Sequence, residues 1–305
     1  MNILFASTIE PAERWIPLLE KALPQDRFLT SPREDVEIAL VAAPPDGVFQ
    51  RLPRLKLVQS LWMGVENLLA DPALPRNVPL TRLIDPGMVN AMSETVLAHV
   101  LDWHRHHYYY RARQREKTWD RLPQYLPSDR TVGLLGLGEL GTHVAERLLP
   151  LGFKLCGWSR RSRALPGVQC FSGANGLEEL LRRSQAVVCL LPLTPQTRGV
   201  LDARAFALMP QGGCVINVAR GAHVAVADLI AALDAGRLAH AYLDVFETEP
   251  LPPDSPLWTH PGVTVTPHTA ALTEPRTSIP MIVENVERVR RGERPVALVD
   301  FTAGY

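Results

Sequence analysis

A glycine-rich turn follows an apolar strand near the middle of the chain. The strand is predicted at residues 131–135, and a helical pattern of apolar residues follows the turn. The turn has the spacing G-x-G-x-x-G and reads Gly136, Leu137, Gly138, Glu139, Leu140, Gly141. Glycines at this spacing permit a tight turn, close approach of the backbone to a pyrophosphate, and close packing of the helix on the strand. The turn therefore predicts a dinucleotide-binding site, helped by the free N–H groups at the start of the helix.

Short apolar strands alternate with helices on both sides of this turn. The predicted strands are 131–135, 154–158, 186–190, 213–218, 240–243 and 263–265. The predicted helices between them are 140–149, 177–183, 202–208 and 226–235. Strands that alternate with helices form parallel sheets covered on both faces, so residues 130–277 are predicted to be a doubly wound α/β domain.

The N-terminal part of the chain shows the same alternation. Its strands are predicted at 3–6, 38–42 and 55–61, and its first helix at 12–23. Pro17 falls inside that helix, and because a proline removes a hydrogen bond there, we expect the helix to start late or to kink. A long helix is expected from residue 93, and a last helix at 281–291 after Pro280. The tail, residues 295–305, is expected to return to the first domain.

Length and composition indicate a globular protein of two domains. The chain has 305 residues, which is room for about two domains. Apolar residues make up 46% of the chain and charged residues 21%, which excludes disordered, collagen-like and membrane-spanning classes. The 32 Lys and Arg residues balance 32 Asp and Glu residues, so no net charge attracts a nucleic acid or an anionic membrane. We expect no nucleic-acid partner and no membrane partner.

The cysteines and the N-terminus favour a cytoplasmic protein. Cys156, Cys170, Cys189 and Cys214 are scattered singly, without a C-x-x-C pair, and we expect them to be reduced thiols in the core. The first residues lack the basic start and the apolar run of a secretory signal. No stretch approaches the roughly 18 uncharged apolar residues of a membrane span.

The residues that follow the predicted strand at 154–158 indicate which dinucleotide the chain binds. An acidic side chain about 20 residues after the turn hydrogen-bonds the ribose of NAD, whereas NADP needs a cation there. This chain has Ser159, followed by Arg160 and Arg161, with Arg163 shortly after. A hydroxyl and guanidinium groups can bind a 2′-phosphate, which a carboxylate would repel. We therefore expect NADPH or NADP to bind, and NADH more weakly; the alternative is that these arginines form only a solvated loop.

Three loops that follow predicted strands carry candidate catalytic residues. Arg220 lies in the sequence Asn-Val-Ala-Arg-Gly, Glu249 follows the strand at 240–243, and His268 follows the strand at 263–265. Loops beyond the carboxyl ends of parallel strands gather at one crevice, so these side chains are expected to converge beside the cofactor. Each residue alone is more often structural than catalytic. Together, in these loops, they predict an active site.

Further segments complete a pattern known from one protein family. They are residues 190–195 (Leu-Leu-Pro-Leu-Thr-Pro), 219–221 (Ala-Arg-Gly), 229–233 with Gly236, 243–250, 256–261 and 267–268. With the glycine turn, they make the chain resemble the NAD(P)-dependent D-2-hydroxyacid dehydrogenases over nearly its whole length, most closely the glyoxylate/hydroxypyruvate reductase A group. The resemblance implies two Rossmann-like or flavodoxin-like α/β domains with doubly wound parallel sheets. Residues 1–99 with 278–305 would bind the substrate, residues 100–277 would bind NADP, and the active site would lie in the interdomain cleft.

The resemblance also implies a role for each matching residue. His268 would protonate the substrate oxygen during hydride transfer, Glu249 would orient the imidazole, and Arg220 would bind the substrate carboxylate. Asp244 would contact the nicotinamide carboxamide. The other cofactor contacts would come from the glycine turn, Leu191, Pro192, Val218 and Ala219, and the other substrate contacts from Met63, Gly64 and Val65. No metal is implied.

The substrate loop departs from the family pattern at two positions. Relatives usually have small residues where this chain has Trp62 and Met63. This bulk either narrows the substrate pocket or points into the core. If it narrows the pocket, glyoxylate should be a better substrate than hydroxypyruvate.

These features favour one function and leave alternatives open. The favoured function is NADPH-dependent reduction of a small 2-oxoacid, such as glyoxylate to glycolate or hydroxypyruvate to D-glycerate. The alternatives are a dehydrogenase for larger 2-oxoacids and a dinucleotide-sensing scaffold similar to corepressor relatives of the superfamily. Residues 104–115, rich in His, Tyr and Arg, belong by resemblance to a helix at a dimer interface, so a homodimer is expected. A metal or RNA site in this tract is poorly supported, because it lacks a second ligand cluster.

Overall fold

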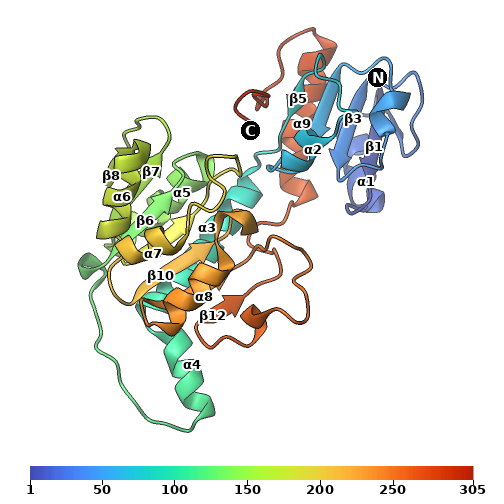
Figure 1. The fold of residues 1–305 in the computed structure, drawn as a ribbon. Helices are drawn as coiled ribbons and strands as arrows, with labels where there is room; N and C mark the ends of the chain where they lie inside the picture. Colours follow the sequence, from blue (N-terminus) through green and yellow to red (C-terminus); the bar gives the residue numbers. More distant parts are fainter. Residues whose placement is uncertain (305) are drawn as a thin grey trace. The chain divides into compact units, whose positions relative to one another are not determined.

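The computed structural model describes residues 1–304, and the chain divides into two compact units (Figure 1). The first unit comprises Met1–Met88 and the segment that begins at Leu272, and the second unit is Val89–Ala271. Each unit is built on one parallel sheet with helices between its strands, which confirms the predicted α/β class.

The division of the chain differs from the predicted boundaries. The predicted boundaries at 99/100 and 277/278 lie inside helices α3 (Pro86–His104) and α9 (Pro275–Arg290). Val96, Val100 and Trp103 of α3 are buried in a core cluster of the second unit, so nearly the whole helix goes with that unit.

The first unit holds a five-stranded sheet in the order β2-β1-β3-β4-β5. All neighbouring strands are parallel. The strands are β1 (Asn2–Ser7), β2 (Arg27–Leu29), β3 (Ile38–Ala42), β4 (Leu57–Ser60) and β5 (Leu80–Thr81), and the helices are α1 (Ala12–Ala22), α2 (Glu66–Ala70) and α9. This is the strand order of flavodoxin-like folds, in which ligands bind where the order reverses, between β1 and β3.

Two helices of the first unit contain a proline. Helix α1 starts at its predicted residue and runs through Pro17, so the late start is not observed. Helix α9 contains Pro280 and begins before it, with Glu274 as its N-cap, so the predicted start after Pro280 is wrong. The expected return of the tail is confirmed, because the N–H of Val299 donates to the carbonyl oxygen of Leu80 at 2.9 Å.

The second unit holds a seven-stranded sheet in the order β12-β11-β10-β9-β6-β7-β8, again fully parallel. The strands are β6 (Thr131–Leu135), β7 (Lys154–Ser159), β8 (Val168–Ser172), β9 (Ala186–Cys189), β10 (Gly213–Asn217), β11 (Leu238–Leu243) and β12 (Val263–Val265). Besides α3, the helices are α4 (His107–Arg115), α5 (Glu139–Leu148), α6 (Gly173–Arg183), α7 (Ala203–Leu208) and α8 (Val226–Asp234). The six predicted strands are confirmed, and the edge strand β8 was missed.

The register of the second sheet gathers the candidate loops at one edge. Leu135, which precedes the glycine turn, lies opposite Cys189 at the end of β9. Asn217, which precedes the Arg220 loop, lies opposite Leu243 at the end of β11. Because every strand is parallel, the turns after β6, β9, β10 and β11 leave the same edge of the sheet.

The cysteines are unpaired, as expected. Cys156, Cys189 and Cys214 are buried, whereas Cys170 is only partly buried. Burial raises the pKa of the Cys189 thiol to about 12, so this thiol is inert at neutral pH. None of the helices in residues 1–304 has the length and apolar content needed to cross a bilayer.

Candidate active site

The glycine turn joins β6 to α5. Its three glycines differ in whether the protein itself leaves room for a side chain. Gly136 has a φ of +109°, a conformation that favours glycine, and a Cβ there would lie 2.9 Å from the carbonyl oxygen of Leu190. A Cβ on Gly141 would collide with the carbonyl oxygen of Gly136. A Cβ on Gly138 would meet no protein atom within 4 Å. The chain's own packing thus requires Gly136 and Gly141, while the space beside Gly138 is open to a ligand.

The start of helix α5 offers backbone donors at this turn. Gly138 is the N-cap, and no side chain caps the helix. Glu139 is exposed and Leu140 is partly buried in the first turn. Uncapped N–H groups and the positive end of the helix dipole suit an anion. The turn therefore fits the pyrophosphate of a dinucleotide, which would approach the backbone where glycine leaves space.

A basic loop after β7 is joined to the glycine turn. Ser159 ends the strand, and its Oγ donates to the carbonyl oxygen of Arg161 at 2.7 Å. Arg160 and Arg161 are exposed. Arg163 donates through Nη1 to the carbonyl oxygen of Leu137, inside the glycine turn. The hydroxyl and the guanidinium groups thus lie at the same sheet edge as the turn.

A histidine that the sequence analysis did not select links the loops after β9 and β10. His223 is buried, with Nε2 3.3 Å from the carbonyl oxygen of Pro192 and Nδ1 3.1 Å from that of Arg220. The predicted cofactor contacts in these loops are buried or, for Pro192, partly buried: Leu191, Pro192, Val218 and Ala219. No motif marked His223, because its role depends on two loops that are distant in sequence.

Arg220 is partly buried in the loop after β10. The side-chain amide of Asn217 donates to the carbonyl oxygen of Arg220 at 2.9 Å, which fixes the turn. A Cβ on the following residue, Gly221, would collide with the backbone of Phe246. The Arg220 loop is therefore packed directly against the segment that leads to Glu249.

The predicted hydrogen bond between His268 and Glu249 is present. Nδ1 of His268 lies 2.7 Å from Oε2 of Glu249, and Oε1 of Glu249 accepts the N–H of Phe246 at 2.8 Å. Because Nδ1 is engaged by a carboxylate, Nε2 is the ring nitrogen left to face a reactant. The His268 side chain is 52% exposed, so a small molecule can reach it. This geometry suits proton transfer by an oriented imidazole.

Asp244 organises the loop that carries His268. The residue is 1% exposed, and its carboxylate accepts hydrogen bonds from Thr266 Oγ1 at 2.6 Å, from Thr269 N at 2.9 Å and from Ala270 N at 3.0 Å. Its carbonyl oxygen accepts the N–H of His268 at 2.8 Å. These bonds hold His268 at a φ of +53°, which is uncommon for a residue other than glycine. The predicted contact of Asp244 with the nicotinamide stays a prediction.

The predicted substrate loop follows β4 in the first unit. Val65 is buried as the N-cap of α2, while Met63 and Gly64 are partly buried. The preceding backbone is fixed, because the N–H of Leu83 donates to the carbonyl oxygen of Trp62 at 3.0 Å. Met63 and Gly64 are thus presented at the carboxyl end of the strand.

In the His-rich tract at residues 104–115, His104 at the end of α3 and His106 are buried, whereas no residue of α4 is buried. His104 is buried and packs edge-on against Phe153, with ring centroids 5.1 Å apart. Over the part of the chain that the structure describes, no group of three or more His, Cys, Asp or Glu side chains is arranged to hold a metal ion.

A glycine turn, an uncapped helix N-terminus and an oriented histidine at one edge of a doubly wound sheet define the class of Rossmann-type oxidoreductases. The chain belongs to the D-isomer specific 2-hydroxyacid dehydrogenase family, because the family model described as "D-isomer specific 2-hydroxyacid dehydrogenase, NAD binding domain" matches residues 97–270. The second unit thus carries the NAD-binding domain of that family.

Solved structures of the same family align along the whole chain. A D-isomer specific 2-hydroxyacid dehydrogenase from Xanthobacter autotrophicus Py2, in complex with NADPH and MES, is 43% identical with a TM-score of 0.96, covering 100% of this chain and 99% of its own. An NADPH-dependent glyoxylate/hydroxypyruvate reductase from Sinorhizobium meliloti, in complex with NADP and sulfate, is 36% identical with a TM-score of 0.93 and the same coverage. A probable 2-hydroxyacid dehydrogenase from Rhizobium etli CFN 42, in complex with NADP, HEPES and L(+)-tartaric acid, is 32% identical with a TM-score of 0.90, also covering 100% and 99%.

Proposed function

We propose that the protein is an NADPH-dependent reductase of small 2-oxoacids, converting glyoxylate to glycolate and hydroxypyruvate to D-glycerate. The hydrogen bond between His268 and Glu249 carries the proposal, because it leaves an accessible, oriented imidazole at the edge that also bears the glycine turn. The reductase from Sinorhizobium meliloti, 36% identical over the whole chain, supports this substrate class.

The chain's own residues supply the proton and the binding groups for such a reaction. The bound dinucleotide would supply a hydride to the carbonyl carbon of the 2-oxoacid. Negative charge then develops on the carbonyl oxygen, and Nε2 of His268 gives a proton to that oxygen. Glu249 keeps the imidazole oriented through its hydrogen bond to Nδ1. After the reaction, solvent can reprotonate the exposed ring.

Binding of the substrate carboxylate falls to two groups in this proposal. Arg220 has a planar guanidinium that can hold a carboxylate and polarise the neighbouring carbonyl. In the first unit, Met63, Gly64 and Val65 follow β4 and would bind a substrate carboxylate through their backbone. Asp244, Leu191, Pro192, Val218 and Ala219 would line the nicotinamide side.

The preference for NADPH is supported by the loop after β7. Ser159 stands where an acidic residue would favour NAD, and Arg160 and Arg161 are exposed beside it. Guanidinium groups attract the 2′-phosphate, and no carboxylate at this position repels it. The Xanthobacter and Sinorhizobium relatives, crystallised with NADPH and NADP, are consistent with this choice.

A panel of substrates tests the proposal. The purified protein is mixed with NADPH or NADH and with glyoxylate, hydroxypyruvate, pyruvate or phenylpyruvate, and the loss of reduced-nicotinamide absorbance is followed. We expect the highest kcat/KM with NADPH and glyoxylate. Preference for phenylpyruvate would instead indicate a dehydrogenase for larger 2-oxoacids. Tight NADPH binding without turnover of any 2-oxoacid would indicate a dinucleotide-sensing scaffold.

We also propose that the protein is a homodimer. Beyond α4, a long loop leaves the body of the second unit (Figure 1). Three large hydrophobic side chains on this loop are exposed: Trp119 at 91%, Tyr125 at 42% and Leu126 at 66%. Exposed aromatic residues grouped in this way mark protein interfaces. Light scattering should give the mass of a dimer, and Trp119→Ser with Leu126→Ser should shift it toward the monomer.

A further inference from the structure

A hydrogen bond links the carboxyl ends of two strands in the first unit. The indole N–H of Trp62, after β4, donates to Oε1 of Glu10, after β1, at 3.4 Å. Strand β3 lies between β1 and β4, so the bond passes over the end of β3. Trp62 is partly buried and is not a member of the core. Its indole N–H is therefore engaged at the sheet edge, which favours the alternative in which its bulk lies beside the substrate loop over the one in which it points into the core.

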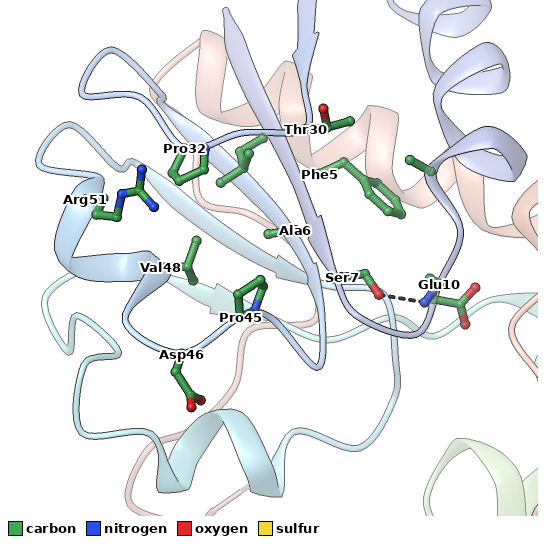
Figure 2. A pocket seen from close by; sticks show the side chains of 12 residues that line it. Phe5, Ala6, Ser7, Glu10, Thr30, Pro32, Pro45, Asp46, Val48 and Arg51 are labelled. Atoms are coloured by element: carbon green, nitrogen blue, oxygen red, sulfur yellow. Dashed lines mark hydrogen bonds between the residues drawn. The ribbon is translucent and has the colours of Figure 1, made fainter.

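Glu10 is itself held by two further hydrogen bonds. Its second carboxylate oxygen, Oε2, accepts the indole N–H of Trp15 at 3.1 Å, and Trp15 is fully buried. Its backbone N–H donates to Oγ of Ser7 at 2.7 Å (Figure 2). Because the bond from Trp62 is the longer of the two indole bonds, Trp15 is the anchor and Trp62 is the group that is positioned.

Glu10 lines a cavity, so the hydrogen bonds described above are the main restraint on its carboxylate. The cavity has a volume of about 210 Å³ and lies where the strand order reverses, lined in part by Ser7, Glu10, Pro45 and Asp46 (Figure 2). Close packing on that side of Glu10 is therefore incomplete. Removing the carboxylate would leave the Trp62 indole with room to turn.

The backbone of the substrate loop is fixed without help from Glu10. The N–H of Trp62 donates to Oγ of Ser60 at 3.0 Å, and the Thr273 hydroxyl donates to the carbonyl oxygen of Leu61 at 3.1 Å. The N–H of Leu83 also binds this segment, at the Trp62 carbonyl oxygen. Glu10 therefore acts on the indole of Trp62 and not on the path of the loop.

We propose that Glu10 is a positioning residue that holds the Trp62 indole as a fixed wall beside the substrate loop, and that this wall restricts the enzyme to small 2-oxoacids. The inference rests on the proposed function, because it takes Met63, Gly64 and Val65 as the site of the substrate carboxylate. In a 2-oxoacid the carboxylate and the variable substituent are joined to the same carbonyl carbon. A rigid indole next to the carboxylate site therefore excludes bulky substituents, whereas a mobile indole can make room for them.

A double-mutant cycle on substrate selectivity tests this inference. The measured quantity is kcat/KM for phenylpyruvate divided by kcat/KM for glyoxylate, with NADPH. We expect Trp62→Ala to raise this ratio about 10-fold or more, and Glu10→Ala to raise it about 3-fold, since the hydrogen bond that holds the Trp62 indole is lost. In the Trp62→Ala background, Glu10→Ala should change the ratio no further, because no indole remains to be held. Equal effects of Glu10→Ala in both backgrounds would overturn the inference.

Two more variants separate positioning from a general loss of structure. Glu10→Gln keeps one acceptor for two indole donors, so it should fold if Glu10→Ala does not and should raise the ratio to a smaller extent. Glu13→Ala changes an exposed glutamate close by and should leave the ratio at the wild-type value. A shift with Glu13→Ala as large as that with Glu10→Ala would contradict a specific role for Glu10.

A measurement without turnover tests the positioning directly. Acrylamide quenching is compared between each protein and its Trp62→Phe counterpart, so that the difference reports Trp62. We expect Trp62 to be quenched more strongly in Glu10→Ala than in the Glu10 protein, and equal quenching would overturn the positioning role. If the wild type reduces no 2-oxoacid, the proposed function and the selectivity role both fail, but quenching still decides whether Glu10 holds Trp62. If it reduces 2-oxoacids but Trp62→Ala leaves the ratio unchanged, only the present inference fails.

Discussion

Nδ1 of His268 lies 2.7 Å from the Glu249 carboxylate, although the two residues are 19 positions apart in the chain. Glu249 is fixed in turn by the backbone N–H of Phe246, and the His268 backbone is fixed by Asp244. Hydrogen bonds thus fix both the ring and the backbone of His268. Such preorganisation is what a proton donor needs in order to act without rearrangement.

Replacing Asp244 by Asn should destabilise the second unit and lower turnover. The carboxylate accepts three hydrogen bonds. In asparagine, the side-chain NH2 group would face one of these N–H or O–H donors and could not accept its hydrogen bond. We expect a loss of about 1–3 kcal/mol in the free energy of unfolding, measured with urea. Asp254→Asn, at an exposed position, serves as the control and should unfold like the wild type. Unchanged stability of Asp244→Asn would contradict the organising role.

Alanine at Gly138 and at Gly141 should have different consequences. Gly138→Ala meets no protein atom, so the unliganded protein should keep its Tm, while the affinity for NADPH should fall roughly 10-fold or more because the Cβ occupies the approach of the pyrophosphate. Gly141→Ala collides with the turn and should lower the Tm without any ligand. Thermal scans and fluorescence titration with NADPH measure both effects. Wild-type NADPH affinity in Gly138→Ala would exclude this turn as the pyrophosphate site.

An acidic residue at position 159 should reverse the dinucleotide preference. Ser159→Asp introduces a carboxylate that repels a 2′-phosphate and can accept a hydrogen bond from a ribose hydroxyl. The ratio of kcat/KM for NADPH over NADH should fall by about 10-fold to 100-fold, which corresponds to about 1.4–2.7 kcal/mol. Arg182→Ala, which removes an arginine on the surface of α6, is the control. A ratio that stays at the wild-type value would indicate that the arginines after β7 form only a solvated loop.

Stability should fall in mild acid because of His240. This residue is 3% exposed, and desolvation lowers its pKa to about 4, while Asp102 nearby opposes the shift. The unfolded chain binds a proton near the ordinary pKa of about 6.5, so stability is full above that pH and is lost as the pH falls toward about 4. His240→Gln should remove part of the loss in Tm between about pH 7 and about pH 4.5. Burial lowers the pKa of His99 as well, so the remaining slope should stay positive. An identical slope in His240→Gln would contradict this origin.

Strong periodic patterns made most of the fold predictable from the sequence. The strand before Gly136 and the helix predicted at 140–149 agree with β6 and α5, because apolar runs and glycine punctuation are local signals. Strand β8 was missed, since its five residues are only partly buried or exposed at the sheet edge and carry little apolar pattern. The predicted start of α9 after Pro280 is wrong, because a proline can lie inside a helix that tertiary packing holds.

The candidate site was predictable only where a motif carried it. His268 and Glu249 each follow a strand, and the parallel topology brings their loops to one edge. The network around Asp244 depends on three donors that lie more than 20 residues away, and His223 bridges two loops. The bond from Trp62 to Glu10 likewise passes across a sheet. Contacts of this kind follow from strand order and register, which no local pattern contains.

The rate of glyoxylate reduction in a single turnover tests the central role of His268 most directly. With saturating NADPH, His268→Ala should lower this rate about 100-fold to 10000-fold, because the proton donor is lost, while NADPH affinity stays at the wild-type value. His260→Ala, which removes a histidine paired with Asp234 elsewhere on the second unit, should react like the wild type. Reduction by His268→Ala at the wild-type rate would contradict the assignment of the proton donor.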